Sequence, residues 1–116
     1  MKQEYVNPFL ASAQLVWEKE LGQDVAMTSA SAVDTRFLTE DITASIGLSG
    51  QLIGTVLYGF PTLTARAIMN VMVGEEVDAR SELAQSALGE LANMVAGNAA
   101  TLLASAGYSC WISPPI

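Results

Sequence analysis

The chain has 116 residues, 51% of them hydrophobic, and a net charge of −7 at pH 7. A chain of this length fits one domain, which buries roughly two thirds of its unfolded surface on folding. Cys110 is the single cysteine and the sequence has no histidine, which excludes an internal disulfide and a Cys/His nucleophile. Neither a zinc site nor thiol chemistry is therefore expected.

The charge pattern argues against nucleic acid and membranes as partners. An acidic chain repels phosphate backbones, and its few basic residues are too scattered to form a patch. Residues 1–6 lack the apolar stretch of a signal peptide, and the apolar segment 52–73 is interrupted by Pro61 and Arg66. We therefore expect a cytoplasmic protein that does not span a membrane. The basic residues are Lys2, Lys19, Arg36, Arg66 and Arg80.

The first part of the chain predicts a helix followed by an irregular strand. Asn7 and Pro8 suit the N-cap and the first position of a helix, and apolar residues then recur at helical spacing until Gly22. These signals predict a helix over residues 8–21. Small and β-branched residues predict an irregular strand over residues 24–35, which a polar connection follows.

A β-hairpin and a second helix are predicted next. Alternating apolar residues indicate strands over 42–48 and 52–60, with the turn at Ser49-Gly50. Pro61 suits the first position of a helix, and its amphipathic spacing continues until Gly74 ends it.

The last part of the chain predicts a long helix and a final strand. Residues 79–106 contain no proline and end before Gly107, and residues 108–112 form a strand that Pro114-Pro115 ends. The predicted order is a helix, three strands, two helices and a strand. This order favours a two-layer α+β fold, with an antiparallel sheet and helices on one face.

The two faces of the long helix differ in chemistry. At about 100° per residue, its apolar residues fall on one arc, which we expect to face the sheet. Glu90 and Asn93 lie on the opposite face, three residues apart, so their side chains are neighbours. A Glu and an Asn at this spacing are most often ordinary solvated residues. The apolar arc comprises Ala84, Leu88, Leu91, Val95, Ala99 and Leu102, and the polar face comprises Glu82, Ser86, Glu90, Asn93 and Gly97.

Two glycines inside the same helix, Gly89 and Gly97, lie close to this pair. Each costs about 1 kcal/mol of helix stability relative to alanine. They would allow either the approach of a partner's backbone or close packing against a neighbouring helix. The sequence favours neither explanation over the other.

The segment Ser86-Ala-Leu-Gly-Glu90-Leu-Ala-Asn93-Met-Val-Ala-Gly-Asn98 resembles the signature of the CheC/CheX/FliY chemotaxis phosphatases. In that signature an Asp or Ser precedes a Glu by four residues, an Asn follows three residues after the Glu, and a Pro comes later. Pro114 or Pro115 falls close to the family proline. The segments Asn7-Pro8-Phe9 and Ile46-Gly47-Leu48-Ser49-Gly50 are also similar to CheX members. The resemblance therefore covers nearly the whole chain.

This resemblance implies a phosphatase that hydrolyses the phosphoaspartate of a CheY-like response regulator in chemotaxis or related two-component signalling. It implies that Asn93 positions the attacking water and that Glu90 pairs with a lysine of the regulator's active site. Ser86, Gly89 and Gly97 are then candidates for contact with the partner. The regulator would bind Mg²⁺, so the phosphatase needs no cofactor or metal of its own. The resemblance also implies a homodimer.

Two departures from the family pattern affect these expectations. Residues 8–21 contain no second Glu-x-x-Asn of the kind many CheC members carry, which favours CheX with one site per chain. Family members continue past the proline, usually as further strands, whereas this sequence stops at Ile116. We therefore expect a single CheX-like domain over residues 1–116 that lacks the C-terminal strands, either because the sequence is a fragment truncated at its C-terminus or because it is a short variant. The strand at 108–112 would then have an unpaired edge that invites another chain.

Two other functions are compatible with the sequence. The first is a non-catalytic module with the CheX fold that docks a signalling protein through the same helix face. The intact Glu90/Asn93 pair argues against it, because docking alone does not need an amide that positions water. The second is a structural homodimer or a flagellar-switch component. A complex that forms only with the phosphorylated regulator would exclude this second function.

Aromatic residues are expected to hold the elements against the core. Trp17 and Trp111 are interpreted as anchors of the first helix and the last strand. Met69, Met72 and Met94 are expected to fill gaps in the core rather than to form a binding surface.

Overall fold

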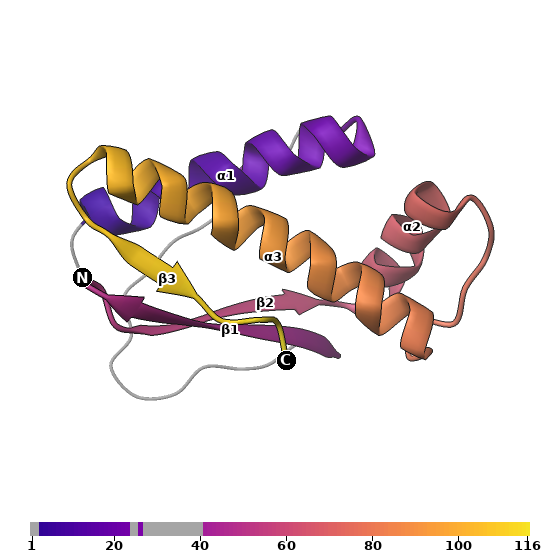
Figure 1. Ribbon diagram of the computed structural model, residues 1–116. Coiled ribbons are helices and arrows are strands. Elements are labelled where there is room, and N and C mark those ends of the chain that lie inside the picture. Colours follow the sequence, from indigo (N-terminus) through magenta and orange to yellow (C-terminus); the bar gives the residue numbers. More distant parts are fainter. Residues whose placement is uncertain (1–2, 24–25, 27–40) are drawn as a thin grey trace.

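The computed structural model describes residues 3–23, 26 and 41–116. Figure 1 shows the sheet on one side and the helices together on the other, with the longest helix lying between the sheet and the first helix. The strands form an antiparallel sheet in the order β2-β1-β3. The predicted α+β class is confirmed. The described elements are α1 (Gln3–Leu21), β1 (Ile42–Gly50), β2 (Gly54–Phe60), α2 (Thr62–Val73), α3 (Glu82–Ser105) and β3 (Cys110–Ile112).

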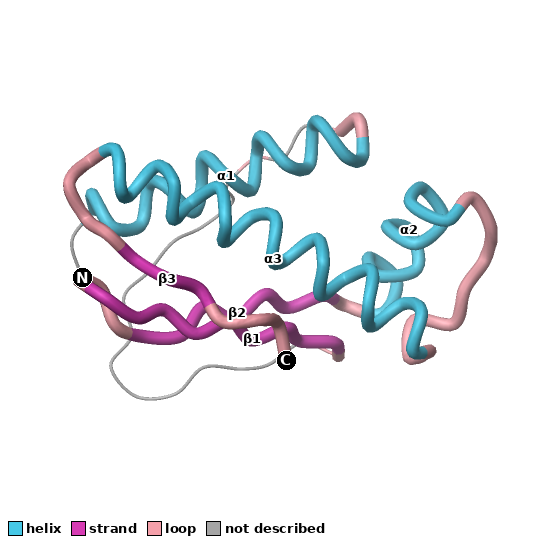
Figure 2. The backbone as a smooth tube through the Cα atoms, viewed as in Figure 1, coloured by secondary structure: helices cyan, strands magenta, loops and turns pink. Residues whose placement is uncertain are grey.

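The strand predicted over 24–35 falls almost entirely outside the described residues. Within the part of the chain that is described, no helix is both long and apolar enough to cross a membrane. Figure 2 shows an extended loop that leads from the end of α2 back to the start of α3.

The core lies between α3 and the sheet and continues between the three helices. Five of the six residues predicted on the apolar arc of α3 are buried, but Leu102 is 39% exposed and Leu103 is buried in its place. Towards its C-terminal end, α3 turns its buried face to β1 and β3, where Ala92 and Ala96 pack on Ile46. Leu103 continues the row of Ala92 and Ala96, which is why the arc shifts.

Met69 is fully buried, and Met72 and Met94 pack against the core, as expected. Trp17 also packs against the core, with its ring stacked on Phe60 at a centroid distance of 6.4 Å. The interpretation of Trp111 as a core anchor is wrong, because its side chain is 65% exposed. It lies on the outward-facing side of an edge strand, where no helix covers it.

The predicted start of the first helix is wrong. Pro8 lies inside α1, which begins at Gln3, so Asn7 is not its N-cap. A proline inside a helix removes one backbone hydrogen bond. Tertiary contacts hold the first turn instead, since the Tyr108 hydroxyl donates a hydrogen bond to Glu4 Oε1 at 2.9 Å. This contact from the far end of the chain overrides the local signal of the proline.

The hairpin turn is displaced from its predicted position. β1 continues to Gly50 and β2 begins at Gly54, so residues 51–53 form the connection instead of Ser49-Gly50. Ser49 and Gly50 remain part of β1 because they pair with β3 on the other edge of that strand. Pairing between distant segments thus decides where the turn lies.

The ends of the other two helices lie close to the predicted positions. Pro61 is the N-cap of α2 rather than its first residue, and Gly74 ends the helix in the left-handed conformation, with φ of 86°. α3 begins at Glu82, because the Ser81 hydroxyl accepts a hydrogen bond from the Ala84 N–H at 3.1 Å. The prediction had begun this helix at Ala79, which is buried ahead of it.

After β3, residues 113–116 continue along β1, and we call them the C-terminal segment. The Ser113 N–H donates to the Gly47 carbonyl at 3.0 Å, and the Gly47 N–H donates to Ser113 Oγ at 2.8 Å. Further along, Ile116 and Ser45 exchange two backbone hydrogen bonds, of 3.0 and 3.1 Å. The C-terminal segment is therefore tied to the sheet at both ends.

The pairing of this segment contains a β-bulge. Gly47 faces Ser113 and Ser45 faces Ile116, which leaves Pro114 and Pro115 opposite the single residue between Ser45 and Gly47. Proline has no N–H to donate, so it is tolerated where a bulge interrupts the ladder. At the bulge, Pro115 lies against Gly89 in the N-terminal half of α3.

Candidate functional site

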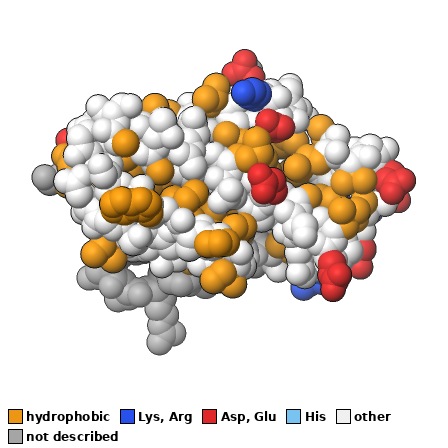
Figure 3. Space-filling view, viewed as in Figure 1, with side chains coloured by type: hydrophobic (Ala, Val, Ile, Leu, Met, Phe, Trp, Pro, Cys, Tyr) orange, Lys and Arg blue, Asp and Glu red, His pale blue; other side chains and the backbone are white. Residues whose placement is uncertain are grey.

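The candidate site is the polar face of α3, along the side of the helix that borders β3 and the C-terminal segment. Ser86 and Glu90 are exposed there, Asn93 and Gly97 are partly buried, and Gly89 is buried. The N-cap at Ser81 and the apolar arc beneath fix the rotation of α3. Ser86 and Glu90 therefore face solvent as predicted, whereas Asn93 and Gly97 are partly covered. In the surface view of Figure 3, acidic side chains are dispersed among apolar ones.

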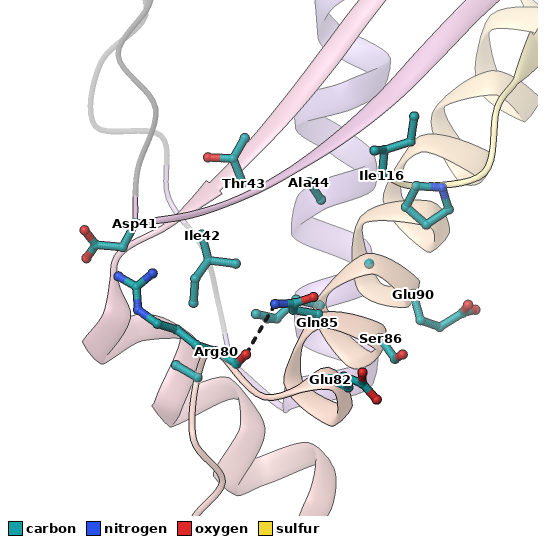
Figure 4. A pocket seen from close by; sticks show the side chains of 14 residues that line it. Asp41, Ile42, Thr43, Ala44, Arg80, Glu82, Gln85, Ser86, Glu90 and Ile116 are labelled. Atoms are coloured by element: carbon teal, nitrogen blue, oxygen red, sulfur yellow. Dashed lines mark hydrogen bonds between the residues drawn. The ribbon is translucent and has the colours of Figure 1, made fainter.

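A cleft of about 840 Å³ borders this face. It lies between the N-terminal half of α3, the start of β1 and the end of the C-terminal segment. Ser86 and Glu90 line one side, and Asp41, Arg80 and Ile116 contribute to the others (Figure 4). No local sequence pattern indicates this cleft, because its walls come from three distant parts of the chain.

The far side of the cleft is fixed by hydrogen bonds. Asp41 Oδ2 accepts from the Thr62 N–H at 3.0 Å and from the Thr62 hydroxyl at 2.9 Å. These two bonds, and then the positive charge of Arg80, lower the pKa of Asp41 below its ordinary value. The Arg80 carbonyl accepts a bond from Gln85 Nε2 at 3.3 Å (Figure 4). Asp41 therefore ties the start of β1 to the start of α2.

Glu90 and Asn93 make no side-chain hydrogen bond with any of the residues that the structure describes. Asn98, five residues after Asn93 on the same helix, donates to the hydroxyl of the buried Ser12 at 2.9 Å. The carboxylate and the carboxamide of the predicted pair are thus available to an approaching molecule.

The two glycines on this helix pack against the chain's own last residues. A Cβ at Gly89 would lie 3.4 Å from Pro115 Cγ, and a Cβ at Gly97 would lie 3.8 Å from Ile112 Cδ1. The sequence left two explanations for these glycines open, the approach of a partner's backbone and close packing against a neighbouring helix. The structure shows close packing, but against β3 and the C-terminal segment rather than against a helix. Contact of Ser86, Gly89 and Gly97 with a partner stays a prediction.

No cluster of three His, Cys, Asp or Glu side chains that could hold a metal ion occurs among residues 3–23, 26 and 41–116. Reasoning from the sequence missed Pro115 as a neighbour of the site, although it noted the proline itself. Only the bulge, which depends on pairing with β1, brings it onto α3.

Known proteins resemble this chain along nearly all of its length. CheY-P phosphatase CheX from Thermotoga maritima is 32% identical over 116 residues, a match that spans 99% of this chain and 75% of that protein. The match to the structure of a CheC-like superfamily protein from Shewanella sp. PV-4 covers 100% of this chain and 76% of that protein's chain, with 30% identity and a TM-score of 0.92. The match to the structure of chemotaxis protein CheX from Vibrio vulnificus covers 97% of this chain and 76% of that one, with 29% identity and a TM-score of 0.89.

The same fold occurs in a CheX–CheY–BeF₃–Mg²⁺ complex from Borrelia burgdorferi, at 24% identity and a TM-score of 0.78, over 97% of this chain and 74% of that one. The sequence model of the family described as chemotaxis phosphatase CheX matches residues 42–116, which are more than half of the chain and include the whole polar face of α3. The chain belongs to the chemotaxis phosphatase CheX family.

Proposed function

We propose that this protein hydrolyses the phosphoaspartate of a CheY-like response regulator, with Glu90 and Asn93 as its working residues. The observation that carries the proposal is its 32% identity, over nearly the whole chain, to a CheY-P phosphatase. The exposed Glu90 and the partly buried Asn93 on one helix face support the assignment of residues.

Asn93 is assigned to position the attacking water. An acyl phosphate is already activated, so its hydrolysis requires a water held in line with phosphorus more than it requires a strong base. A carboxamide both donates and accepts hydrogen bonds, and it carries no negative charge that would repel the phosphoryl oxygens. The Asn93 side chain makes no hydrogen bond to any described residue. It can therefore both donate a hydrogen bond to the water and accept one from it.

Glu90 is assigned to docking. Its carboxylate is exposed at the edge of the cleft and would repel the phosphoryl group at close range, but it would attract a cationic side chain. The lysine of the regulator's active site is the partner we propose for it. Because Glu90 lies three residues before Asn93, this contact would orient the amide towards the phosphorus.

The regulator is proposed to bring the Mg²⁺ ion. The Borrelia burgdorferi complex contains CheX, CheY, BeF₃ and Mg²⁺ together. Acidic side chains of the regulator would hold the ion through oxygen ligands, the kind that Mg²⁺ prefers. Its charge would offset that of the phosphoryl oxygens during attack.

We also propose a homodimer. β2 and β3 are the two outer strands of the described sheet, and an outer strand offers unpaired backbone groups to a second chain. Light scattering coupled to size exclusion should give a mass of about twice 12.2 kDa. A monomer at micromolar concentration would contradict this part of the proposal.

The decay of a phosphorylated, Mg²⁺-loaded response regulator tests the enzymatic function. The wild-type protein should accelerate the loss of phosphate, and Asn93→Ala should abolish the acceleration while still binding the phosphorylated regulator. Glu90→Ala should raise KM more than it lowers kcat, because it removes docking. Asn70→Ala replaces an exposed asparagine on α2 and should behave as wild type.

The non-catalytic docking module gives a different result in the same experiment. Folded wild-type protein would bind the phosphorylated regulator but leave its rate of decay unchanged. Full activity of Asn93→Ala would instead contradict the assignment of Asn93 while leaving the phosphatase function intact.

A further inference from the structure

We propose that Pro115 is a positioning residue for Asn93, acting through its contact with Gly89. This inference rests on the proposed function, because it assigns a role relative to the water-positioning amide. It concerns how the molecule fixes that amide before a partner binds.

Helix geometry places three residues of α3 on one face. Gly89, Asn93 and Gly97 are each four residues apart, so successive members differ by only about 40° around the helix and share one face. Pro115 packs on the first of them and Ile112 lies next to the last. Asn93 lies between these two contacts and therefore adjoins the stretch of chain between Ile112 and Pro115. The burial of Gly89 and the partial burial of Asn93 and Gly97 agree with this placement.

The wall beside Asn93 is rigidly held. Ser113 Oγ accepts from the Gly47 N–H at 2.8 Å and lies 3.1 Å from the Pro114 carbonyl oxygen, to which it donates. Ile116 is bonded to β1 on the far side of the bulge. The position of Pro115 is therefore determined by the sheet, while its ring rests on α3.

The proline at position 115 has a chemical consequence here. Any other residue at this position would present a backbone N–H beside α3, which could donate to the carbonyl oxygen of the Asn93 side chain. Pro115 fills the space against Gly89, one turn before Asn93, without offering the amide a donor. Asn93 is thus confined sterically and remains free to bind water. Precise placement matters, because a misplacement of about 1 Å can cost on the order of 100-fold in rate.

Pro115→Ala and Pro114→Ala form a matched pair for the test. Both remove a ring at the bulge and restore an N–H, but Pro114 is exposed whereas Pro115 supplies the atoms nearest to Gly89. With phosphorylated regulator as substrate, Pro115→Ala should lower kcat about tenfold with KM unchanged. Pro114→Ala should stay within about twofold of wild type at a similar melting temperature. Equal kcat values for the two variants would overturn the inference.

Rescue distinguishes positioning from a general loss of stability. Gly89→Ala adds a methyl group facing the space that Pro115→Ala empties, so the double variant should recover much of the lost kcat. Should Pro115→Ala fail to fold, Gly89→Val provides a second test, because its larger side chain displaces Pro115 from the opposite side. Ala104→Val is its control, since it adds the same branched side chain at an exposed position near the end of the same helix. Retention of full kcat by Gly89→Val would then overturn the inference.

Asn93→Ala in the same series separates this inference from the proposed function. If Asn93→Ala is fully active, the role of Asn93 fails and the positioning role fails with it. If Asn93→Ala is inactive while Pro115→Ala and Pro114→Ala have equal kcat, the positioning role alone fails.

Discussion

Asn93 and Asn98 illustrate how the same side chain serves two purposes on one helix. Asn98 is held by the buried Ser12 and contributes to the contact between α1 and α3. Asn93 has no such bond within the described residues. An amide whose bonds are all made inside the protein cannot orient a water molecule, so the difference between these residues matches the roles proposed for them.

Tyr58 presents the opposite situation, a polar group that the described structure leaves without a partner. Its hydroxyl is buried between the two parts of the core and makes no hydrogen bond to any described residue. Burial raises the pKa of this phenol to about 12. A buried hydroxyl without a partner costs about 1–3 kcal/mol.

Tyr58→Phe should therefore leave the free energy of unfolding unchanged or increase it by about 1 kcal/mol, because no hydrogen bond is lost. Urea denaturation of the two proteins would measure the difference. Tyr108→Phe is the matched control and should destabilise the protein, since the hydroxyl of Tyr108 donates to Glu4. A clear loss of stability in Tyr58→Phe would mean that its hydroxyl has a bonding partner.

Among the secondary-structure elements, α2 has an unusual start. Its N-cap is Pro61, whose side chain cannot accept a hydrogen bond, and Asp41 supplies the missing acceptor from the start of β1. A carboxylate at a helix N-terminus also interacts favourably with the helix dipole. The cap of α2 thus comes from a different element and positions one wall of the cleft.

Asp41→Asn should reduce stability at neutral pH and have less effect in acid. The pKa of Asp41 is lowered by folding, so its contribution is present above the unfolded value of 3.8. That contribution is lost as the pH falls through the lower pKa of the folded state. Melting temperatures measured from pH 7 to pH 2 should therefore show the wild type and the variant converging at the acid end.

Glu75→Gln provides the control for this pH series. It removes the same charge from an exposed loop position that caps no helix. If the melting temperature of Asp41→Asn differs from that of the wild type by the same amount at every pH, the charge of Asp41 does not cause the loss of stability.

In the whole molecule, α1 is joined to the rest by contacts distant in sequence. Ser12 is fully buried and accepts a hydrogen bond from Asn98, and Tyr108 packs edge-on against Tyr5 with ring centroids 5.0 Å apart. These contacts place α1 alongside α3, next to the helix face that carries the candidate site.

Ser12→Ala should lower the free energy of unfolding by about 1–3 kcal/mol, because the partly buried Asn98 amide would lose its acceptor. Urea denaturation followed by circular dichroism would measure the change. Ser105→Ala is the comparison, since that exposed hydroxyl bonds only to the Thr101 carbonyl of its own helix. Its effect should be within about 0.5 kcal/mol. Equal effects of the two variants would show that the buried bond contributes no stability.

Much of the architecture could be predicted because the signals were local and strong. The alternation of 42–48 and the helical spacing within 79–106 identified β1 and α3, and Gly74 ended α2 as expected. The errors share one cause. Pro8 inside α1 and the displaced hairpin turn both arise where a contact with a distant segment outweighs a local preference.

The sequence by itself determined the family and the position of Glu90 and Asn93 on one face of a helix. Both follow from residue type and spacing, because 3.6 residues per turn puts residues three apart side by side. Only the tertiary structure decided what surrounds that face. The cleft, the cap from Asp41 and the contact of Pro115 with Gly89 each join segments far apart in the chain. Such contacts depend on how the sheet pairs and bulges, and no local pattern encodes them.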